Sequence, residues 1–227
     1  MSSNVLEVFW FSGSPYVWRV MLTLEAKEIA YTSRLLQASL GEHKTPEFLA
    51  LSPRGKVPAL RDGNFVVYES IAIMQYLEAK YPARPLFGRN AQETATIWRV
   101  ISEFSSYLEP QLFRVDVLLL TGKSQEAAAE VRAALPGVLT ELDKLEASLA
   151  HGPWLLGADT TAADITVYPF VKLLMRGAEK EAAVELGIGS SSLHQRYPRL
   201  ATWMKHVEQL PGYERTYPPH WRPASKL

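Results

Sequence analysis

Apolar residues in the first third of the chain follow a strand period and a helix period in turn. Val5 to Phe11 is a short apolar run, which predicts a buried strand. Pro15 to Lys27 carries apolar residues at the spacing of one helical face, at Val17, Val20, Met21 and Leu24. A second strand is predicted from Ala30 to Leu36, and a helical turn from Thr45 to Leu51. Because a helix connects the two strands, we expect them to be parallel.

Two further strands and a helix complete the first predicted domain. Val57 to Arg61 and Phe65 to Tyr68 are joined by Asp62-Gly63-Asn64, a strong signal for an antiparallel hairpin. Glu69 to Lys80 has the apolar spacing of a helix and ends before a proline. The pattern therefore predicts an α+β domain over residues 1–82, in which helices pack on a four-stranded sheet.

The rest of the chain, beyond a linker at residues 83–90 that contains proline and glycine, has a helical pattern. We expect helices at 91 to about 120, 124–150, about 161–176 and about 197–209. The proline-containing tail, 216–227, should be irregular. This part is strand-poor, which predicts a second, all-α domain over residues 91–227.

Composition and charge exclude several classes of function. Of the 227 residues 47% are hydrophobic, but no apolar run approaches the roughly 20 residues that cross a bilayer. The start of the chain lacks the pattern of a secretory signal, so we expect a cytoplasmic protein without a membrane partner. Lys plus Arg and Asp plus Glu number 24 each, which argues against a nucleic-acid partner. With no cysteine and no metal-ligand spacing among five histidines, we expect no metal.

Ser14, at the start of the first helix, is the first candidate for chemistry. Serine followed by proline is a favoured way to begin a helix, so Ser14 and Pro15 need no function to explain them. A helix N-terminus after a strand also gathers free N–H groups and a partial positive charge, which suits an anion. A hydroxyl there can donate a hydrogen bond to a bound thiolate or carboxylate. Ser12 is the rival hydroxyl, and both interpretations of Ser14 stay open.

Two further segments have a structural and a functional interpretation. A cis Val57–Pro58 bond would turn the N–H and C=O of Val57 towards a peptide-like ligand, although only about 5–6% of bonds before proline are cis. Glu69 and Ser70 open a helix and suit its dipole, but Ser70 could also hold a carboxylate while Glu69 pairs with an amine. By contrast, Thr161 and Asp164 fit a capping box, and we expect them to serve folding.

The order of these signals resembles the cytosolic glutathione S-transferases, over the whole chain. The segments that carry the resemblance are SPYVWRVMLTLEAKEIAY, LSPRGKVPAL and VVYESIAIMQYLEAKYP. The first is similar to serine-type members, in particular the tau-, zeta- and theta-like branches. The resemblance implies a thioredoxin-like glutathione-binding domain at 1–82 and a helical domain at 91–227 that supplies most of the second-substrate pocket.

The resemblance also implies roles for individual residues. Ser14 would be the catalytic hydroxyl that stabilises the glutathione thiolate. The glutathione-binding residues would be Lys44, Lys56, Val57, Glu69 and Ser70, with Pro58 as a cis-proline. Tyr16 and Phe113 are candidates for the second-substrate pocket, and each has an alternative role as a core or interface aromatic, which is equally favoured for Phe113.

A glutathione transferase that acts on hydrophobic electrophiles is the function that the resemblance implies. Glutathione would be its co-substrate, and family members are usually homodimers. Three alternatives remain: a glutathione-dependent isomerase, a peroxidase, and a non-catalytic glutathione-binding or scaffold module. The isomerase is less favoured because FSGSP stands where that branch has a serine-serine-cysteine motif.

Overall fold

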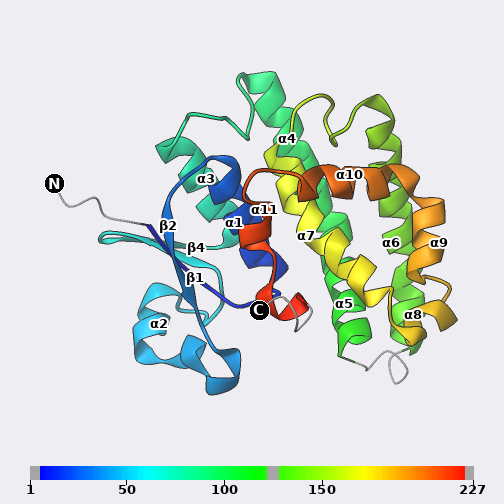
Figure 1. The fold of residues 1–227 in the computed structure, drawn as a ribbon, viewed down its shortest axis with the longest axis horizontal. Helices are drawn as coiled ribbons and strands as arrows, with labels where there is room; N and C mark the ends of the chain where they lie inside the picture. The colour runs from blue at the N-terminus through cyan, green and yellow to red at the C-terminus, as the bar shows by residue number, and fades with distance from the viewer. Residues whose placement is uncertain (1–5, 122–127, 223–227) are drawn as a thin grey trace. The chain divides into compact units, whose positions relative to one another are not determined.

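Four strands form one mixed sheet in the order β2-β1-β3-β4 (Figure 1). The structure is a computed structural model that describes residues 6–121 and 128–222. β1 (Leu6–Trp10) pairs parallel with β2 (Tyr31–Leu35) and antiparallel with β3 (Ala59–Asp62), and β3 pairs antiparallel with β4 (Phe65–Tyr68). The predicted strands are confirmed, although β3 begins two residues late because Pro58 has no N–H to donate to the sheet.

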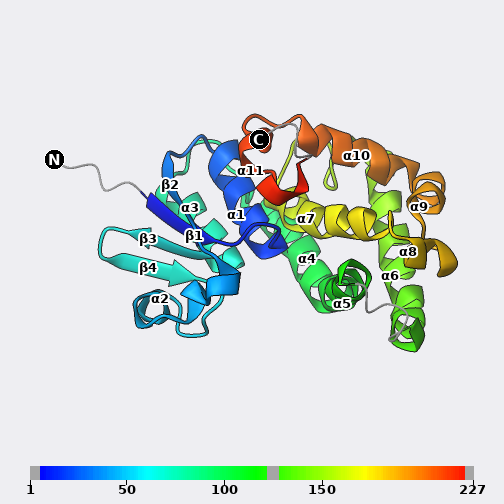
Figure 2. The ribbon, with the colours of Figure 1, turned by 60° about the horizontal axis from the view of Figure 1, so that its bottom comes forward.

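Helices cover both faces of this sheet. α1 (Pro15–Ala26) and α3 (Ser70–Lys80) lie on one face, and α2 (Pro46–Leu51) lies on the other (Figure 2). Two short helical turns, η1 (Ala38–Leu40) and η2 (Glu42–Lys44), lead from β2 to α2. These elements have the predicted βαβ-ββα order of a thioredoxin-like domain.

Alternation along β1 explains why both faces are covered. Trp10 is buried in a cluster with Val17 and Met21 of α1. The next residue back, Phe9, points to the opposite face, where its ring lies 6.1 Å from that of Phe48 in α2. Successive side chains of a strand point to opposite faces, so one short apolar strand supports both layers.

Residues 210–222 pack on α1 and belong to the same compact unit as the sheet, whose other part ends at Pro85. This segment contains α11 (Tyr213–Thr216) and a turn, η5 (Pro219–Trp221); Figure 1 shows α11, in red, beside α1, in blue. The indole N–H of Trp18 donates to Thr216 Oγ1 at 2.8 Å. The predicted second domain, 91–227, included this segment, and nothing local in the sequence indicates that it pairs with the first helix.

The second unit, Leu86–Gln209, contains helices and no strand in the part that the structure describes, apart from a single β-bridge between Trp154 and Gly157, so the predicted helical domain is confirmed. Its helices are α4 (Ala91–Glu103), α5 (Glu109–Leu120), α6 (Ala128–Ser148), α7 (Ala162–Gly177), α8 (Glu181–Glu185), α9 (Ser190–Arg196) and α10 (Pro198–Glu208), and it has a short turn, η4 (Leu149–His151). The short helices α8 and α9 had no predicted counterpart. The first four residues of the predicted 124–150 helix lie outside the described residues.

A π-helical segment, η3 (Phe104–Leu108), divides the long helix predicted from 91 to about 120. Pro110 lies in the first turn of the next helix, α5, and has no N–H to continue the regular ladder, so the hydrogen-bond spacing changes just before it. At the start of α7 the predicted capping box is confirmed, with the Thr161 N–H donating to Asp164 Oδ2 at 2.9 Å.

Candidate functional site

The strand register brings the predicted site segments to one end of the sheet. Phe9 pairs with Ala59, and Ala59 pairs with Tyr68. The loop that holds Ser14 follows β1, the Val57–Pro58 bond precedes β3, and Glu69 follows β4. Because β3 runs antiparallel to its two neighbours, all three positions lie at the same end of the strands, which is called the site edge of the sheet below. The loop after β2 begins there too, since Leu35 pairs with Trp10.

Ser14 is the N-cap of α1. Its backbone is extended (φ −74°, ψ 120°), and its Oγ accepts from the Val17 N–H at 3.4 Å. Gly13 has a φ of 87°, which lets the chain turn sharply between strand and helix. The hydrogen bond uses an oxygen lone pair and leaves the hydroxyl proton to be donated elsewhere. Ser14 can therefore cap α1 and still donate its hydroxyl proton to a ligand.

Ser12 has a partner that the sequence did not reveal. Its Oγ lies 2.6 Å from Nδ1 of His220 in η5. The imidazole also lies against the intervening glycine, because a Cβ added to Gly13 would lie 2.8 Å from Cε1 of His220. The two residues of this pair are 208 positions apart, so no local signal could have connected them.

The Val57–Pro58 peptide is cis, the geometry that the resemblance implied. None of the described residues makes a hydrogen bond with the N–H or C=O of Val57. The Val57 side chain packs against the cluster around Trp10, which fixes its backbone at the edge of the sheet. Before it, the Lys56 carbonyl accepts from Ser52 Oγ at 2.8 Å. The backbone of Val57 therefore has one donor and one acceptor without a partner among the described residues.

Two lysines near this edge carry exposed charges. Lys44 ends η2 and Lys56 immediately precedes Val57, and both side chains are exposed. Within the described ranges, neither forms an ion pair with a carboxylate. They are therefore suited to meeting a carboxylate that comes from solution.

Ser70 starts α3 and is buried, whereas Glu69 before it is exposed. Ser70 Oγ accepts from the Nε–H of Arg19 at 2.9 Å, and Arg19 is itself only 3% exposed. The guanidinium lies 5.0 Å from the ring centroid of Tyr16. The sequence did not identify Arg19 as a site residue, yet it ties the N-terminus of α3 to α1 with a buried positive charge.

Glu69 has a left-handed backbone conformation, with a φ of 69°. Such an angle is unfavourable for a residue with a Cβ, and strained residues of this kind cluster at functional sites. No side chain caps α3 at this position. The Glu69 carboxylate is thus held at the edge of the sheet, beside the first N–H groups of a helix.

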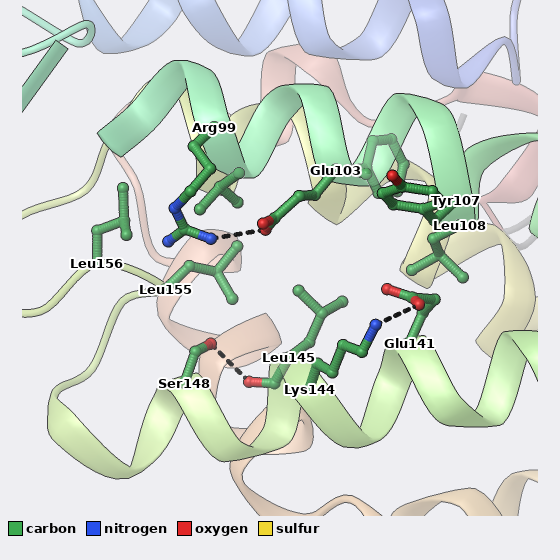
Figure 3. Close-up of a pocket in the computed structure, with 12 residues that line it drawn as sticks. Arg99, Glu103, Tyr107, Leu108, Glu141, Lys144, Leu145, Ser148, Leu155 and Leu156 are labelled. Carbon is green, nitrogen blue, oxygen red and sulfur yellow. Dashed lines mark hydrogen bonds and ion pairs between the residues drawn. The ribbon is translucent and has the colours of Figure 1, made fainter. Parts of the chain in front are cut away.

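Phe113, the other candidate for the second substrate, is half-buried on α5 in the second unit. That unit contains a pocket of about 380 Å³ between α4 and α6, which Phe113 does not line (Figure 3). Ion pairs occupy its rim, with Arg99 against Glu103 at 2.7 Å and Lys144 against Glu141 at 2.6 Å. Leucines form much of the remaining wall, so the pocket suits an apolar group and offers no charge without a partner.

The described ranges contain neither a candidate metal site nor a candidate membrane span. No group of three or more His, Asp or Glu side chains in residues 6–121 and 128–222 is placed to hold a metal ion. Nor does any helix within those ranges have the length and apolar character to cross a membrane.

Comparisons with known proteins identify the family. Residues 13–80 match the model of the glutathione S-transferase N-terminal domain, and residues 125–206 match that of the C-terminal domain. Glutathione S-transferase A from Pleuronectes platessa is 30% identical over 224 residues, which cover 95% of this chain and 92% of the relative.

Solved structures agree with this result. A glutathione S-transferase from the Antarctic clam Laternula elliptica is 30% identical, with a TM-score of 0.79 over 96% of this chain and 94% of its own. Ure2p in complex with glutathione has the same fold, with a TM-score of 0.80 at 23% identity over 95% of this chain and 99% of its own. The chain therefore belongs to the glutathione S-transferase family, with a thioredoxin-like domain and a helical domain.

Proposed function

We propose that this protein is a glutathione transferase in which Ser14 stabilises the glutathione thiolate for attack on hydrophobic electrophiles. The observation that carries the proposal is the position of Ser14 as N-cap of α1, with a hydroxyl that accepts from Val17 and keeps its own proton. Glutathione is the co-substrate of the family to which the chain belongs.

The chemistry of Ser14 follows from the charge on sulfur. A thiol has a pKa of about 8.5, whereas the nucleophile is the thiolate. A hydrogen bond from the Ser14 hydroxyl and the positive end of α1 both favour the charged form. A hydrogen bond to a charged group contributes about 1.5–3 kcal/mol, which corresponds to roughly a tenfold to hundredfold gain in thiolate. Serine acts here as a donor and stays protonated.

Ser14 is a better candidate than Ser12 for this role. Ser12 Oγ already shares a hydrogen bond of 2.6 Å with Nδ1 of His220. Ser14 uses only an oxygen lone pair, in a long contact of 3.4 Å. Its position at the helix terminus also adds the backbone N–H groups that Ser12 lacks.

The rest of the tripeptide matches groups along the same edge of the sheet. The unpaired N–H and C=O of Val57 suit its backbone. At the γ-glutamyl end, Glu69 suits the amine, and Ser70 with the N-terminus of α3 suits the α-carboxylate. Lys44 and Lys56 suit the glycine carboxylate. We propose these roles together, and we propose Tyr16 and Phe113 for contact with the second substrate.

A set of four variants tests the proposal. Ser14→Ala should retain the fold and lower turnover of an aryl halide roughly tenfold to a hundredfold, because the hydrogen bond to the charged sulfur is lost. Loss of the helix cap should cost about 1 kcal/mol of unfolding free energy. Ser14→Thr keeps a hydroxyl and should retain much of the activity.

Asn90→Ala is the matched control for the lost cap, because Asn90 Oδ1 caps α4 through the N–H groups of Gln92 and Glu93. It should lower stability by a similar amount and leave turnover unchanged. Retention on immobilised glutathione separates binding from catalysis. Loss of activity in Ser12→Ala with full activity in Ser14→Ala would refute the assignment. Binding without turnover of aryl halides, hydroperoxides or maleylacetoacetate-like acids would instead indicate a non-catalytic module.

A further inference from the structure

The turn that carries Ser14 is closed by long hydrogen bonds. The Ser14 N–H donates to the Phe11 carbonyl at 3.5 Å, and the Val17 N–H donates to Ser14 Oγ at 3.4 Å. Both exceed the length of about 3 Å that is typical of such bonds. Gly13, between strand and helix, adds a φ of 87°. The hydroxyl that is to meet the sulfur therefore stands on a turn that these two bonds hold only weakly.

A much shorter polar contact joins this turn to the C-terminal segment, residues 210–222. Ser12 Oγ lies 2.6 Å from Nδ1 of His220, and the two atoms share one hydrogen bond whichever of them donates. The imidazole also packs on Gly13, because a Cβ added there would lie 2.8 Å from its Cε1. The C-terminal segment thus contacts the two residues that immediately precede Ser14.

The C-terminal segment is itself fixed along α1. At the C-terminal end of this helix, Arg215 forms an ion pair with the buried carboxylate of Glu25. Nearer its N-terminus, the indole N–H of Trp18 donates to Thr216 Oγ1 at 2.8 Å, and the Trp18 ring centroid lies 5.5 Å from that of Trp221. All these contacts belong to one compact unit. The imidazole that meets the turn is therefore carried by an anchored segment.

We propose that His220 is a positioning residue for the catalytic hydroxyl of Ser14. Its hydrogen bond with Ser12 and its packing on Gly13 fix the turn from which that hydroxyl donates to the glutathione thiolate. The inference rests on the proposed function. In this role His220 acts through the turn and takes no proton from the thiol. Misplacement of a reacting group by about 1 Å can cost roughly a hundredfold in rate, so a contact that fixes the turn affects turnover.

The effect of this contact falls on ionisation of the thiol more than on glutathione affinity. The groups that we propose for the backbone and the charged ends of the tripeptide lie on other segments, after β2, before β3 and after β4. A loosened turn leaves those groups in place and weakens the hydrogen bond to sulfur, so the bound thiol ionises at a higher pH. A role of His220 in stability alone would not change that pH.

The ultraviolet absorbance of the thiolate, measured against pH in the glutathione complex of the full chain, tests the proposal. For His220→Ala we expect half-ionisation of the bound thiol about one pH unit above wild type, with kcat for an aryl halide roughly tenfold lower at neutral pH. KM for glutathione should change little. His220→Asn keeps an amide near the place of Nδ1, which can donate or accept, and should recover most of the ionisation. His220→Gln places its amide nearer Nε2 and should recover less.

A double-mutant cycle with Ser12 separates positioning from direct contact with sulfur. Ser12→Ala should give much of the change seen in His220→Ala, and the double variant should give no more than His220→Ala alone, because the pair acts as a unit. A large further loss when Ser12→Ala is added to His220→Ala would show that Ser12 itself bonds the sulfur, and it would overturn the proposal. Ser12→Ala decides the question even if His220→Ala fails to fold.

His194→Ala is the matched control, because Nδ1 of this exposed histidine of α9 lies 2.7 Å from the Ser190 carbonyl oxygen in the second unit. It loses a comparable contact and should ionise the thiol as wild type does. Wild-type ionisation in Ser12→Ala, or in a folded His220→Ala, would overturn the role of His220 and leave the proposed function standing. Absence of a thiolate in the wild-type complex would refute the proposed function itself, and the inference with it.

Discussion

Glu69 has a backbone conformation that lowers stability and a carboxylate that we propose for glutathione binding. Its φ of 69° disfavours a side chain, and its carboxylate caps no backbone group of α3. We expect Glu69→Gly to leave the unfolding free energy unchanged or to raise it by up to about 1 kcal/mol, since relief of strain outweighs the extra chain entropy. The same change should weaken glutathione binding roughly tenfold, because an ionic contact is lost.

Denaturant unfolding and calorimetry check the two halves of this prediction. Glu28→Gly is the matched control, because Glu28 also has a positive φ, of 54°, and lies away from the site edge in an exposed pair with Arg84. It should change stability by a similar amount and leave glutathione affinity alone. Equal affinity in Glu69→Gly and wild type would remove Glu69 from the site.

Asp116 of α5 is a buried carboxyl without a hydrogen-bond partner among the described residues. Burial raises its pKa well above the usual range, so the folded state holds a proton that the unfolded state releases at neutral pH. Its contribution is therefore most favourable in acid, below the ordinary aspartate pKa, and becomes unfavourable as pH rises towards the folded pKa. This is the reverse of the usual behaviour of a paired carboxylate.

We expect Asp116→Leu to stabilise the protein by about 1–3 kcal/mol at neutral pH, because an unsatisfied buried polar group is removed. The gain should shrink as pH falls towards the ordinary aspartate pKa, where the wild type no longer loses a proton on unfolding. Unfolding free energies measured at several pH values check the sign. A gain that grew in acid would show that Asp116 is ionised in the folded protein.

At the scale of elements, the capping box of α7 organises more than one helix. Asp164 is fully buried, and its carboxylate accepts from the Leu155 N–H and the Trp203 indole N–H, each at 2.9 Å, as well as from Thr161. It therefore joins the loop before α7 to α10. The sequence predicted the cap, but the bond to Trp203 depends on tertiary packing.

Asp164→Ala should cost about 3 kcal/mol or more of unfolding free energy, since several buried donors lose their acceptor together. Asn90→Ala removes the exposed cap of α4 and should cost only about 1 kcal/mol. Denaturant unfolding of both variants checks the contrast. Similar small losses would mean that water replaces the Asp164 carboxylate.

Features of the fold could be predicted from the sequence where the interacting residues are close together along the chain. The hairpin at Asp62-Gly63-Asn64 and the cap at Ser14 arise from neighbours along the chain, and both occur as predicted. The pairing of Ser12 with His220 and the packing of Thr216 on Trp18 join distant segments. Their residues carry no periodic or motif signal, so only the folded chain reveals them.

In the proposed function the two units have different roles: the first binds glutathione, and the second contributes most of the contacts to the electrophile. The residues that we propose to bind glutathione lie within the first unit, whereas Phe113 and the pocket between α4 and α6 lie within the second. The family resemblance assigns the choice of electrophile mainly to the second domain, and the homodimer it implies likewise stays a prediction. Formation of the thiolate is common to transfer, peroxide reduction and isomerisation.

Activities on a panel of substrates therefore distinguish the contribution of the first unit from that of the second. Ser14→Ala should lower activity on aryl halides, hydroperoxides and maleylacetoacetate-like acids by a similar factor, because each reaction loses the same thiolate. Phe113→Ala should change the relative rates by roughly tenfold, the effect of an apolar contact in a substrate pocket, and leave glutathione affinity unchanged. Tyr107→Ala is the control for a side chain that lines the pocket between α4 and α6 and is 58% exposed. If Tyr107→Ala shifts the relative rates and Phe113→Ala does not, the electrophile binds in that pocket, and Phe113 has only a packing role.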